Sequence, residues 1–259
     1  MKNRFIVSFG SVPGSYHRQL FKNNQDAVHV DKSERLLVGV VCDGCGSGAH
    51  SEVGAELAAR FIVQWLMSKS EPLSAPDVDF EKILEEMREE ILEFFRQCAA
   101  PLGENLTQIV LEYFLFTVVG FVATEKQTVL FTKGDGVFAL NGELAAIDEN
   151  NEPSYLSFGL LSQEKARQKF VIRKILDTAG LENLIIATDG LSELENRKNE
   201  TIAICGDNQL VGGIGQFVAE DKYGRNASAL QKRLNVLGLN HKLLTDDTTV
   251  ALLRKRREA

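Results

Sequence analysis

Short runs rich in β-branched and aromatic residues, separated by Gly, Asn and Asp, constrain the fold of this chain more than any other feature. They predict strands at 4–9, 27–30, 36–42, 114–123, 128–132, 137–140, 169–175, 184–188 and 248–253. Two long amphipathic patterns predict helices, one after the N-cap Ser51 with its apolar stripe over 53–66 and one over 80–98. Shorter helices are expected at 209–220 and 227–237. Because strands and helices do not alternate regularly, the sequence indicates an α+β fold in which helices cover sheets.

A single domain over residues 1–259 is expected, because the sequence has no internal repeat, low-complexity tract or Pro/Gly linker. Residues 141–170 have the weakest pattern, and we interpret them as a flap or long surface loop, where function often concentrates. The basic run that starts at Arg254 opens a C-terminal tail, 254–259. We interpret this tail as solvated rather than as a contact for nucleic acid.

The overall charge and hydropathy exclude several classes of function. The formal net charge of −7 argues against general nucleic-acid binding, which needs a basic surface. The longest apolar stretch, 113–123, is far shorter than the about 20 residues of a membrane-spanning helix. The apolar part of the first ten residues is also too short and broken for a secretory signal. We therefore expect a cytoplasmic protein that contacts neither nucleic acid nor membrane.

The four cysteines are Cys42, Cys45, Cys98 and Cys205. The C-x-x-C formed by the first two is typical of a redox pair or of half a zinc site. No second C-x-x-C and no clustered His pair completes a zinc site, and Cys42 lies inside an apolar strand pattern. We favour the interpretation that these thiols pack structurally.

Aspartates lie at the ends of five of the predicted strands. They are Asp26, Asp43, Asp135, Asp189 and Asp246, the last followed by Asp247. Any one of them is explained by a turn, since Asp and Gly are common turn residues. As a set, their strand ends could converge at one edge of a sheet, where neighbouring carboxylates would need cations such as magnesium or manganese. The residues alone leave two hypotheses open: a two-metal hydrolase and an ordinary α+β binding domain.

Five motifs resemble, in sequence order, those of the metal-dependent serine/threonine protein phosphatases of type 2C, the PPM family. They are "NNQDAV" (23–28), "VVCDGCGSG" (40–48) followed by "SEVGAELAA", "KGDGVFAL" (133–140), "IIATDGLSE" (185–193) and "LTDDTTVALL" (244–253). The segment "GSYH" (14–17) resembles a Gly-Ser-x-His segment of the bacterial branch. The resemblance extends from about Ser8 to Leu253.

The resemblance implies a four-layer α-β-β-α sandwich, with two antiparallel sheets flanked by helices and metals at one edge. It implies that Asp43 bridges two Mn²⁺ or Mg²⁺ ions, with the carbonyl of Gly44 and the carboxylate of Asp26 completing one site. Asp189 and Asp246 would hold the other ion. Asp135 would join Asp189 at a weaker third site, and 141–170 would include the family's flap.

The implied activity is hydrolysis of phosphoserine or phosphothreonine in proteins by a hydroxide that bridges the two metals. The implied partners are a phosphorylated protein substrate and a cognate serine/threonine kinase system, and we expect a monomer. Two alternatives stay open: a non-catalytic signalling module of the same fold that binds a kinase or phosphoprotein, and a phosphatase for small-molecule phosphates.

The sequence also departs from the family pattern. Phe21 stands where many members place an arginine that grips the phosphate, which leaves His17, Arg18 and Lys22 as available substitutes. His17 could contact the phosphate or act as a general acid, or it could be structural. Cys45 stands where many relatives carry His or Met, and Gly136-Val137 replace the Ser-Arg that usually follows the third aspartate.

Overall fold

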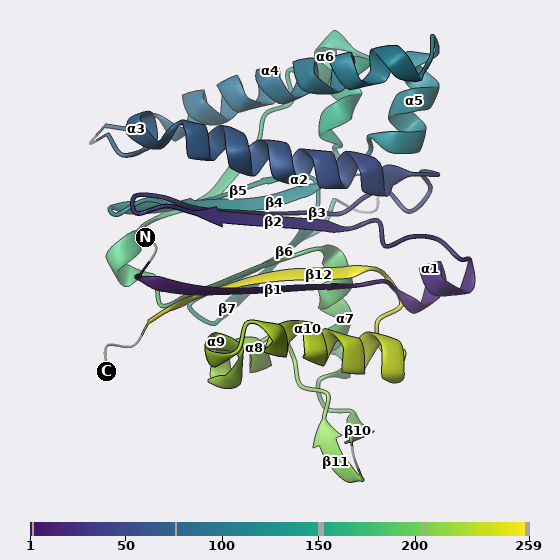
Figure 1. Ribbon diagram of the computed structural model, residues 1–259, viewed down its shortest axis with the longest axis vertical. Helices are drawn as coiled ribbons and strands as arrows, with labels where there is room; N and C mark the ends of the chain where they lie inside the picture. The colour runs from purple at the N-terminus through teal and green to yellow at the C-terminus, as the bar shows by residue number, and fades with distance from the viewer. Residues whose placement is uncertain (2, 76, 150–152, 205, 257–259) are drawn as a thin grey trace.

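Two antiparallel sheets lie face to face, with helices on both outer faces (Figure 1). The chain's structure is a computed structural model, which describes residues 1, 3–75, 77–149, 153–204 and 206–256. One sheet has the order β2 (Ala27–Lys32), β3 (Leu37–Cys42), β4 (Val118–Ala123), β5 (Gln127–Lys133), β8 (Val171–Asp177). The other has the order β1 (Phe5–Val12), β12 (Thr248–Lys255), β9 (Asn183–Ala187), β6 (Gly136–Leu140), β7 (Glu143–Ile147). The predicted α+β class and the four-layer α-β-β-α arrangement are confirmed.

The long helices α2 (Ser51–Ser68) and α4 (Phe80–Ala99) cover the outer face of the first sheet (Figure 1). The second sheet is covered by α7 (Glu193–Arg197), α8 (Gln216–Ala219), α9 (Lys222–Arg225) and α10 (Ser228–Asn235). The remaining helices are α1 (Ser15–Gln19), α3 (Ser70–Leu73), α5 (Leu106–Tyr113), α6 (Gln163–Ala166) and the short η1 (Ala100–Leu102), η2 (Leu156–Leu160), η3 (Thr178–Gly180), η4 (Asp189–Ser192), η5 (Val236–Asn240). A hairpin of β10 (Thr201–Ile204) and β11 (Asp207–Leu210) projects from the second sheet's helices. None of the described helices is both long and apolar enough to span a membrane.

Alternation along the strands explains why the sheets stack. In β3, Val38, Val40 and Cys42 join the core between this sheet and α2 and α4, whereas Leu37 and Val41 join the core between the two sheets. Successive strand residues point to opposite faces, so a strand buried on both faces must be apolar throughout. The burial of every residue of β3 and β4 confirms that these strands are central.

Some predicted boundaries were wrong. The strand expected at 114–123 begins four residues later, at Val118, because Phe114 is the C-cap of α5 and both Phe114 and Phe116 pack against Phe95 of α4. The helix expected at 209–220 contains only α8, because Leu210 ends β11 and glycines follow, among them Gly212 with φ of 71°. Helix α2 begins at Ser51, but its N-cap is His50, and the Ser51 hydroxyl donates instead to the carbonyl of Cys45 at 3.0 Å.

Two expected irregular segments contain regular structure. The flap region, 141–170, includes β7, η2 and α6, with 150–152 outside the described residues. The basic tail, 254–259, starts inside the sheet, because Arg254 and Lys255 are the last residues of β12. Arg254 donates to Asp221 at 2.7 Å and Lys255 to Glu182 at 2.6 Å, so neither side chain is simply solvated. Residues 257–259 lie outside the described residues.

Candidate metal centre

The register of the strands brings the predicted aspartates to one edge of the sandwich. Ala27 pairs with Cys42 in the antiparallel β2–β3 ladder, so Asp26 and Asp43 are the next facing pair. Strand β9 ends at Ala187 beside Val250 of β12, which places the following Asp189 next to the start of β12 and the preceding Asp246.

Four of the five predicted metal-binding carboxylates line one cavity of about 200 Å³. They are Asp43, Asp135, Asp189 and Asp246, and Gly44 lines it with them. Asp26 is not part of the lining, but it faces Asp43 and is hydrogen-bonded by the hydroxyl of Thr188, whose Oγ1 lies 2.8 Å from Asp26 Oδ2. The structure therefore brings together the residues that the motifs singled out.

The backbone around Asp43 is fixed by neighbouring loops. The amide of Thr117 donates to the carbonyl of Asp43 at 2.8 Å, and the amide of Gly44 donates to the carbonyl of Gln25 at 3.1 Å. A Cβ at Gly44 would lie 2.6 Å from that Gln25 carbonyl oxygen. Residue 44 must therefore be glycine for the loop to pass this close to the segment that carries Asp26.

The carboxylates repel one another. Burial, and then the neighbouring Asp26, Asp189 and Asp246, raises the pKa of Asp43 well above its ordinary value. Burial and Asp247 likewise raise the pKa of Asp26, although hydrogen bonds from Thr188 and Thr249 oppose the rise. Near neutral pH such a cluster either takes up protons or stays ionised with cations bound to balance its charge.

The pKa values of Asp135 and Asp246, which also line the cavity, are raised as well. Burial, followed by the negative charge of Asp189, raises the pKa of Asp135 to about 6. Burial also raises the pKa of Asp246, an effect that a hydrogen bond from the amide of Asp247 partly offsets.

The donor set fits a hard divalent cation. Oxygen ligands from several carboxylates and a backbone carbonyl are what magnesium and manganese prefer. Asp26 supplies an independent sign, because its Oδ1 is buried and has no hydrogen-bond partner among the described residues. A buried carboxylate oxygen without a partner is costly, and a bound cation would satisfy it.

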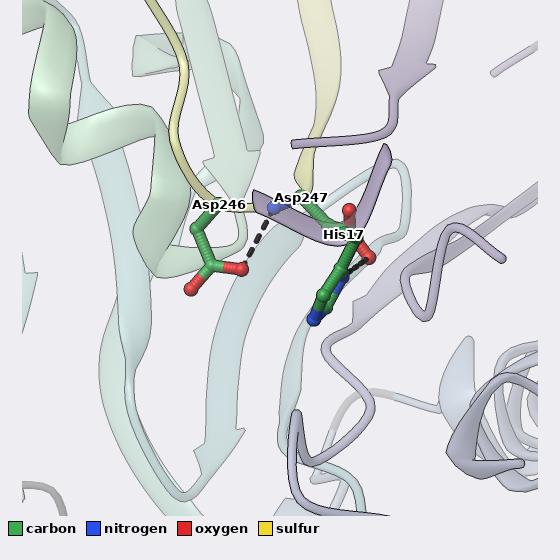
Figure 2. Close-up of side chains that lie close together, drawn as sticks. All are labelled: His17, Asp246 and Asp247. Carbon is green, nitrogen blue, oxygen red and sulfur yellow. Dashed lines mark hydrogen bonds and ion pairs between the residues drawn. The ribbon is translucent and has the colours of Figure 1, made fainter. Parts of the chain in front are cut away.

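Helix α1 places His17 beside this centre (Figure 2). Nδ1 of His17 lies 2.8 Å from Oδ2 of Asp247, and both side chains are buried. Asp247 also accepts from the amides of Gly14 at 2.7 Å and Gln25 at 2.6 Å. The sequence predicted no role for Asp247, which was noted only as the neighbour of Asp246. The two features that could have pointed to this pair are the doubled Asp before a strand and the His of the "GSYH" segment.

Arg18 and Lys22, the other two residues that could replace the phosphate-binding arginine, differ in whether they contact a residue that lines the cavity. Arg18, one residue after His17 and so on another side of α1, donates to the carbonyl of Gly238 at 2.8 Å and does not line the cavity. Lys22 donates to the carbonyl of Gly46, a cavity residue, at 2.7 Å. Phe21 is 97% exposed, with φ of 54°. None of these three side chains lines the cavity itself, but His17 and Lys22 both lie against Gly46 of its wall, whereas Arg18 binds at Gly238.

The predicted flap region contributes to the wall of the cavity. Pro153 and Tyr155 line it, and the Tyr155 hydroxyl hydrogen-bonds the thiol of Cys45, which also lies 3.2 Å from the Ser47 hydroxyl. Cys42 is buried in the core, as the packing interpretation expected, whereas Cys45 lines the cavity. Cys42, Cys45 and Cys98 are free thiols, and Cys205 lies outside the described residues.

Comparison with solved structures supports this fold. A bacterial serine phosphatase is similar with a TM-score of 0.60 and 14% identity, over 98% of each chain. The catalytic domain of the serine/threonine phosphatase PstP, solved in complex with two manganese ions, has a TM-score of 0.53 and 15% identity, over 98% of this chain and 100% of that one. The serine/threonine phosphatase Stp1 from Staphylococcus aureus has a TM-score of 0.52 and 15% identity, over 98% of this chain and 95% of that one.

Comparison of sequences identifies the family. No curated protein matches the chain significantly. The sequence profile described as "Protein phosphatase 2C", however, matches residues 13–231, which is most of the chain. The resemblance carried by the aspartate motifs is therefore confirmed, and this chain belongs to the protein phosphatase 2C family.

Proposed function

We propose that this protein is a Mn²⁺- or Mg²⁺-dependent phosphatase that hydrolyses phosphoserine or phosphothreonine in protein substrates. The observation that carries the proposal is the cavity in which Asp43, Asp135, Asp189 and Asp246 meet, with Asp26 facing Asp43. The proposal is supported by the family to which the chain belongs and by the oxygen-only donor set.

In this proposal, Asp43 would help to hold two cations. Asp26 and the carbonyl of Gly44 would hold one of them, Asp189 and Asp246 would hold the other, and Asp135 with Asp189 would offer a weaker third site. When bound, two such cations would activate a water molecule for attack on phosphorus and would neutralise the phosphate oxygens. The cavity of about 200 Å³ is several times the ~30 Å³ that one water occupies in the liquid, so it has room for a phosphoryl group beside ions.

The chain's own residues would hold and orient the substrate. Lys22, whose ammonium group is bound to the carbonyl of Gly46 at the rim, provides a positive charge where a phosphate would enter. Thr188 orients the carboxylate of Asp26, and Tyr155 and Pro153 close one wall against solvent. His17 takes part in substrate binding or proton transfer. A kinase reaction must supply such a phosphoprotein.

A non-catalytic module of the same fold is the alternative. The observation that favours it is the absence of an arginine from the described cavity wall, since Arg18 binds Gly238 and Phe21 points a fully exposed ring to solvent. Such a module would bind a phosphoprotein without hydrolysing it.

The test is metal-dependent hydrolysis of a phosphoserine peptide and of 4-nitrophenyl phosphate by the wild type, Asp43→Asn and Asp189→Asn. Asp207→Asn, on the exposed hairpin strand β11, is the matched control, and circular dichroism confirms that each variant folds. Turnover that needs Mn²⁺ or Mg²⁺, survives in Asp207→Asn and is lost in both cavity variants supports the phosphatase. A folded wild type that binds the peptide but hydrolyses neither substrate would establish the module instead. Hydrolysis of metabolite phosphates in preference to phosphopeptides would redirect the substrate class to small molecules.

A further inference from the structure

We propose that Asp247 is a positioning residue that holds the ring of His17 with Nε2 toward the cavity, where His17 protonates the leaving seryl or threonyl oxygen. This inference rests on the proposed function and deepens it. It assigns the proton donor of the reaction and the carboxylate that orients it.

Asp247 is the point at which three segments meet. Its Oδ1 accepts from the amide of Gly14, and its Oδ2 accepts from the amide of Gln25 and contacts Nδ1 of His17 (Figure 2). The side chains of His17 and Asp247 are only 5% and 2% exposed. A carboxylate that accepts two amide N–H groups acts as an acceptor toward the ring as well, so Nδ1 of His17 donates to it. The contact therefore fixes both the rotation of the ring and the position of one proton.

With Nδ1 engaged, Nε2 is the nitrogen that remains for chemistry. Figure 2 shows it on the side of the ring away from Asp247. It lies beside Gly46, which lines the cavity: a Cβ on residue 46 would be 3.7 Å from Nε2. The helix α1 thus delivers the free nitrogen of His17 to the wall of the site that holds the carboxylates.

The same side chains could instead be imagined as a further metal site, because ligand atoms of His17, Asp246 and Asp247 lie within 4.8 Å of one another. The hydrogen bonds of Asp247 argue against this. Both of its oxygens already accept amide protons, and the ring nitrogen nearest to it is the one that donates. Oδ2 already has two donors, which leaves a cation only the remaining acceptor site on Oδ1, and Nδ1 of His17 carries a proton instead of a free lone pair, so we assign the pair to proton transfer.

In the proposed step, water supplies the oxygen that attacks phosphorus, and the bond between phosphorus and the seryl or threonyl oxygen breaks. The electron pair of that bond goes to the leaving oxygen, and the proton on Nε2 passes to it, so that the product leaves as a neutral alcohol. The ring then recovers a proton from solvent in place of the one that the attacking water released. Asp247 keeps its contact with Nδ1 throughout, so the ring stays oriented during the transfer.

The dependence on the leaving group tests this assignment. An alkoxide is a poor leaving group and needs the proton, whereas 4-nitrophenolate leaves without one. We expect His17→Gln to lower kcat on a phosphoserine peptide about 10²-fold, which is within the range for loss of a general acid. On 4-nitrophenyl phosphate we expect kcat to fall only about 10-fold. Asp247→Asn should show the same split, and the double variant should lose no more than His17→Gln alone, because the two residues act as a unit. The control is His29→Gln, on β2 away from the cavity.

Two measurements on the protein without substrate complete the test. In metal-free wild type, ¹⁵N NMR should find the Nδ1 proton of His17 hydrogen-bonded, and Asp247→Asn should change that signature. Manganese affinity, measured by calorimetry, should be the same in His17→Gln and in wild type. The NMR spectrum of the wild type and the manganese affinity of His17→Gln do not depend on Asp247→Asn. They therefore test the role of His17 even when Asp247→Asn does not fold.

The failures of the two proposals are distinguishable. A wild type that hydrolyses both substrates, with equal losses on both in His17→Gln, keeps the phosphatase and overturns the acid. A clear loss of manganese affinity in His17→Gln overturns it in favour of a metal ligand. A wild type that hydrolyses neither substrate overturns the proposed function and this step together.

Discussion

The hydroxyl of Thr188 donates a hydrogen bond of 2.8 Å to Oδ2 of Asp26 and accepts one of 3.0 Å from the amide of Thr249. It therefore joins the end of β9 and the start of β12 to a carboxylate that precedes β2. One oxygen of Asp26 is occupied in this way, and the other is left for a cation.

Replacing Thr188 with valine should weaken metal binding without changing the shape of the side chain. We expect about a tenfold loss of manganese affinity, typical of a residue that orients a metal ligand. The buried amide of Thr249 would also lose its acceptor, which costs about 1–3 kcal/mol of stability. Calorimetry and thermal unfolding measure the two effects, and Thr188→Ser, which keeps the hydroxyl, should restore both. Equal affinity in Thr188→Val and Thr188→Ser would show that Asp26 needs no such support.

The two glycines on either side of Cys45 make a matched pair. A Cβ at Gly44 would lie 2.6 Å from the carbonyl oxygen of Gln25, whereas a Cβ at Gly46 would meet nothing closer than Nε2 of His17 at 3.7 Å. Gly44→Ala should therefore lower stability by about 1–3 kcal/mol, or about 2–12 °C in Tm, and weaken manganese binding. Gly46→Ala should keep the wild-type Tm within error. Equal Tm values for the two variants would contradict the close packing of this loop.

The sequence predicted the central strands of the two sheets because those strands are buried on both faces. Leu37–Cys42 and Val118–Ala123 are apolar at almost every position, which leaves little ambiguity. Strand β7 (ELAAI) was not predicted because it has one β-branched residue, whereas the other mostly exposed edge strand, β8 (VIRKILD), has three. Phe114 and Phe116 misled the prediction of β4 because their hydrophobicity serves packing against α4 rather than pairing in the sheet.

The aspartates of the site could be predicted because each follows or precedes a recognisable strand, and the family resemblance gave them an order. The role of Asp247 could not, because it depends on where α1 returns to the sheet, which no local pattern encodes. For the same reason Arg18 and His17 were equal candidates from the sequence. They are adjacent in a helix, and only the packing of α1 decides that His17 faces the centre while Arg18 faces Gly238.

The acidic cavity should make the metal-free protein less stable as pH rises. Burial, and next Asp189, raises the pKa of Asp135 to about 6 in the folded state, against about 3.9 in an unfolded chain. Between these values the folded protein binds more protons, so the free energy of unfolding falls with increasing pH. With allowance for solvent screening, this one group contributes about 1–2 kcal/mol, or about 2–8 °C in Tm.

Metal should reverse this trend, and Asp135→Asn should weaken it. With saturating Mn²⁺, the ionised carboxylates are neutralised, and Tm should instead fall as pH is lowered from 7 to 5, because protons compete with the metal. In metal-free Asp135→Asn, the slope of Tm against pH should be shallower but still present, since the pKa values of Asp26, Asp43 and Asp246 are raised as well. Thermal unfolding across this pH range, with chelator and with Mn²⁺, measures both. Parallel slopes in the two conditions would show that these carboxylates bind no cation.

Cys45 should be the most reactive of the thiols that the structure describes. Burial alone would raise its pKa, but hydrogen bonds from Ser47 and Tyr155 outweigh that effect and lower the pKa, whereas burial raises the pKa of Cys98 and of Cys42. The thiolate is the nucleophile, so iodoacetamide at neutral pH should label Cys45 first, Cys98 more slowly and Cys42 last in the native, metal-free protein. Peptide mapping by mass spectrometry reads the order. Tyr155→Phe removes one hydrogen bond and should slow labelling of Cys45 while leaving labelling of Cys98 unchanged. If Cys98 is labelled faster than Cys45 in the wild type, the arrangement of Tyr155 over the cavity is contradicted.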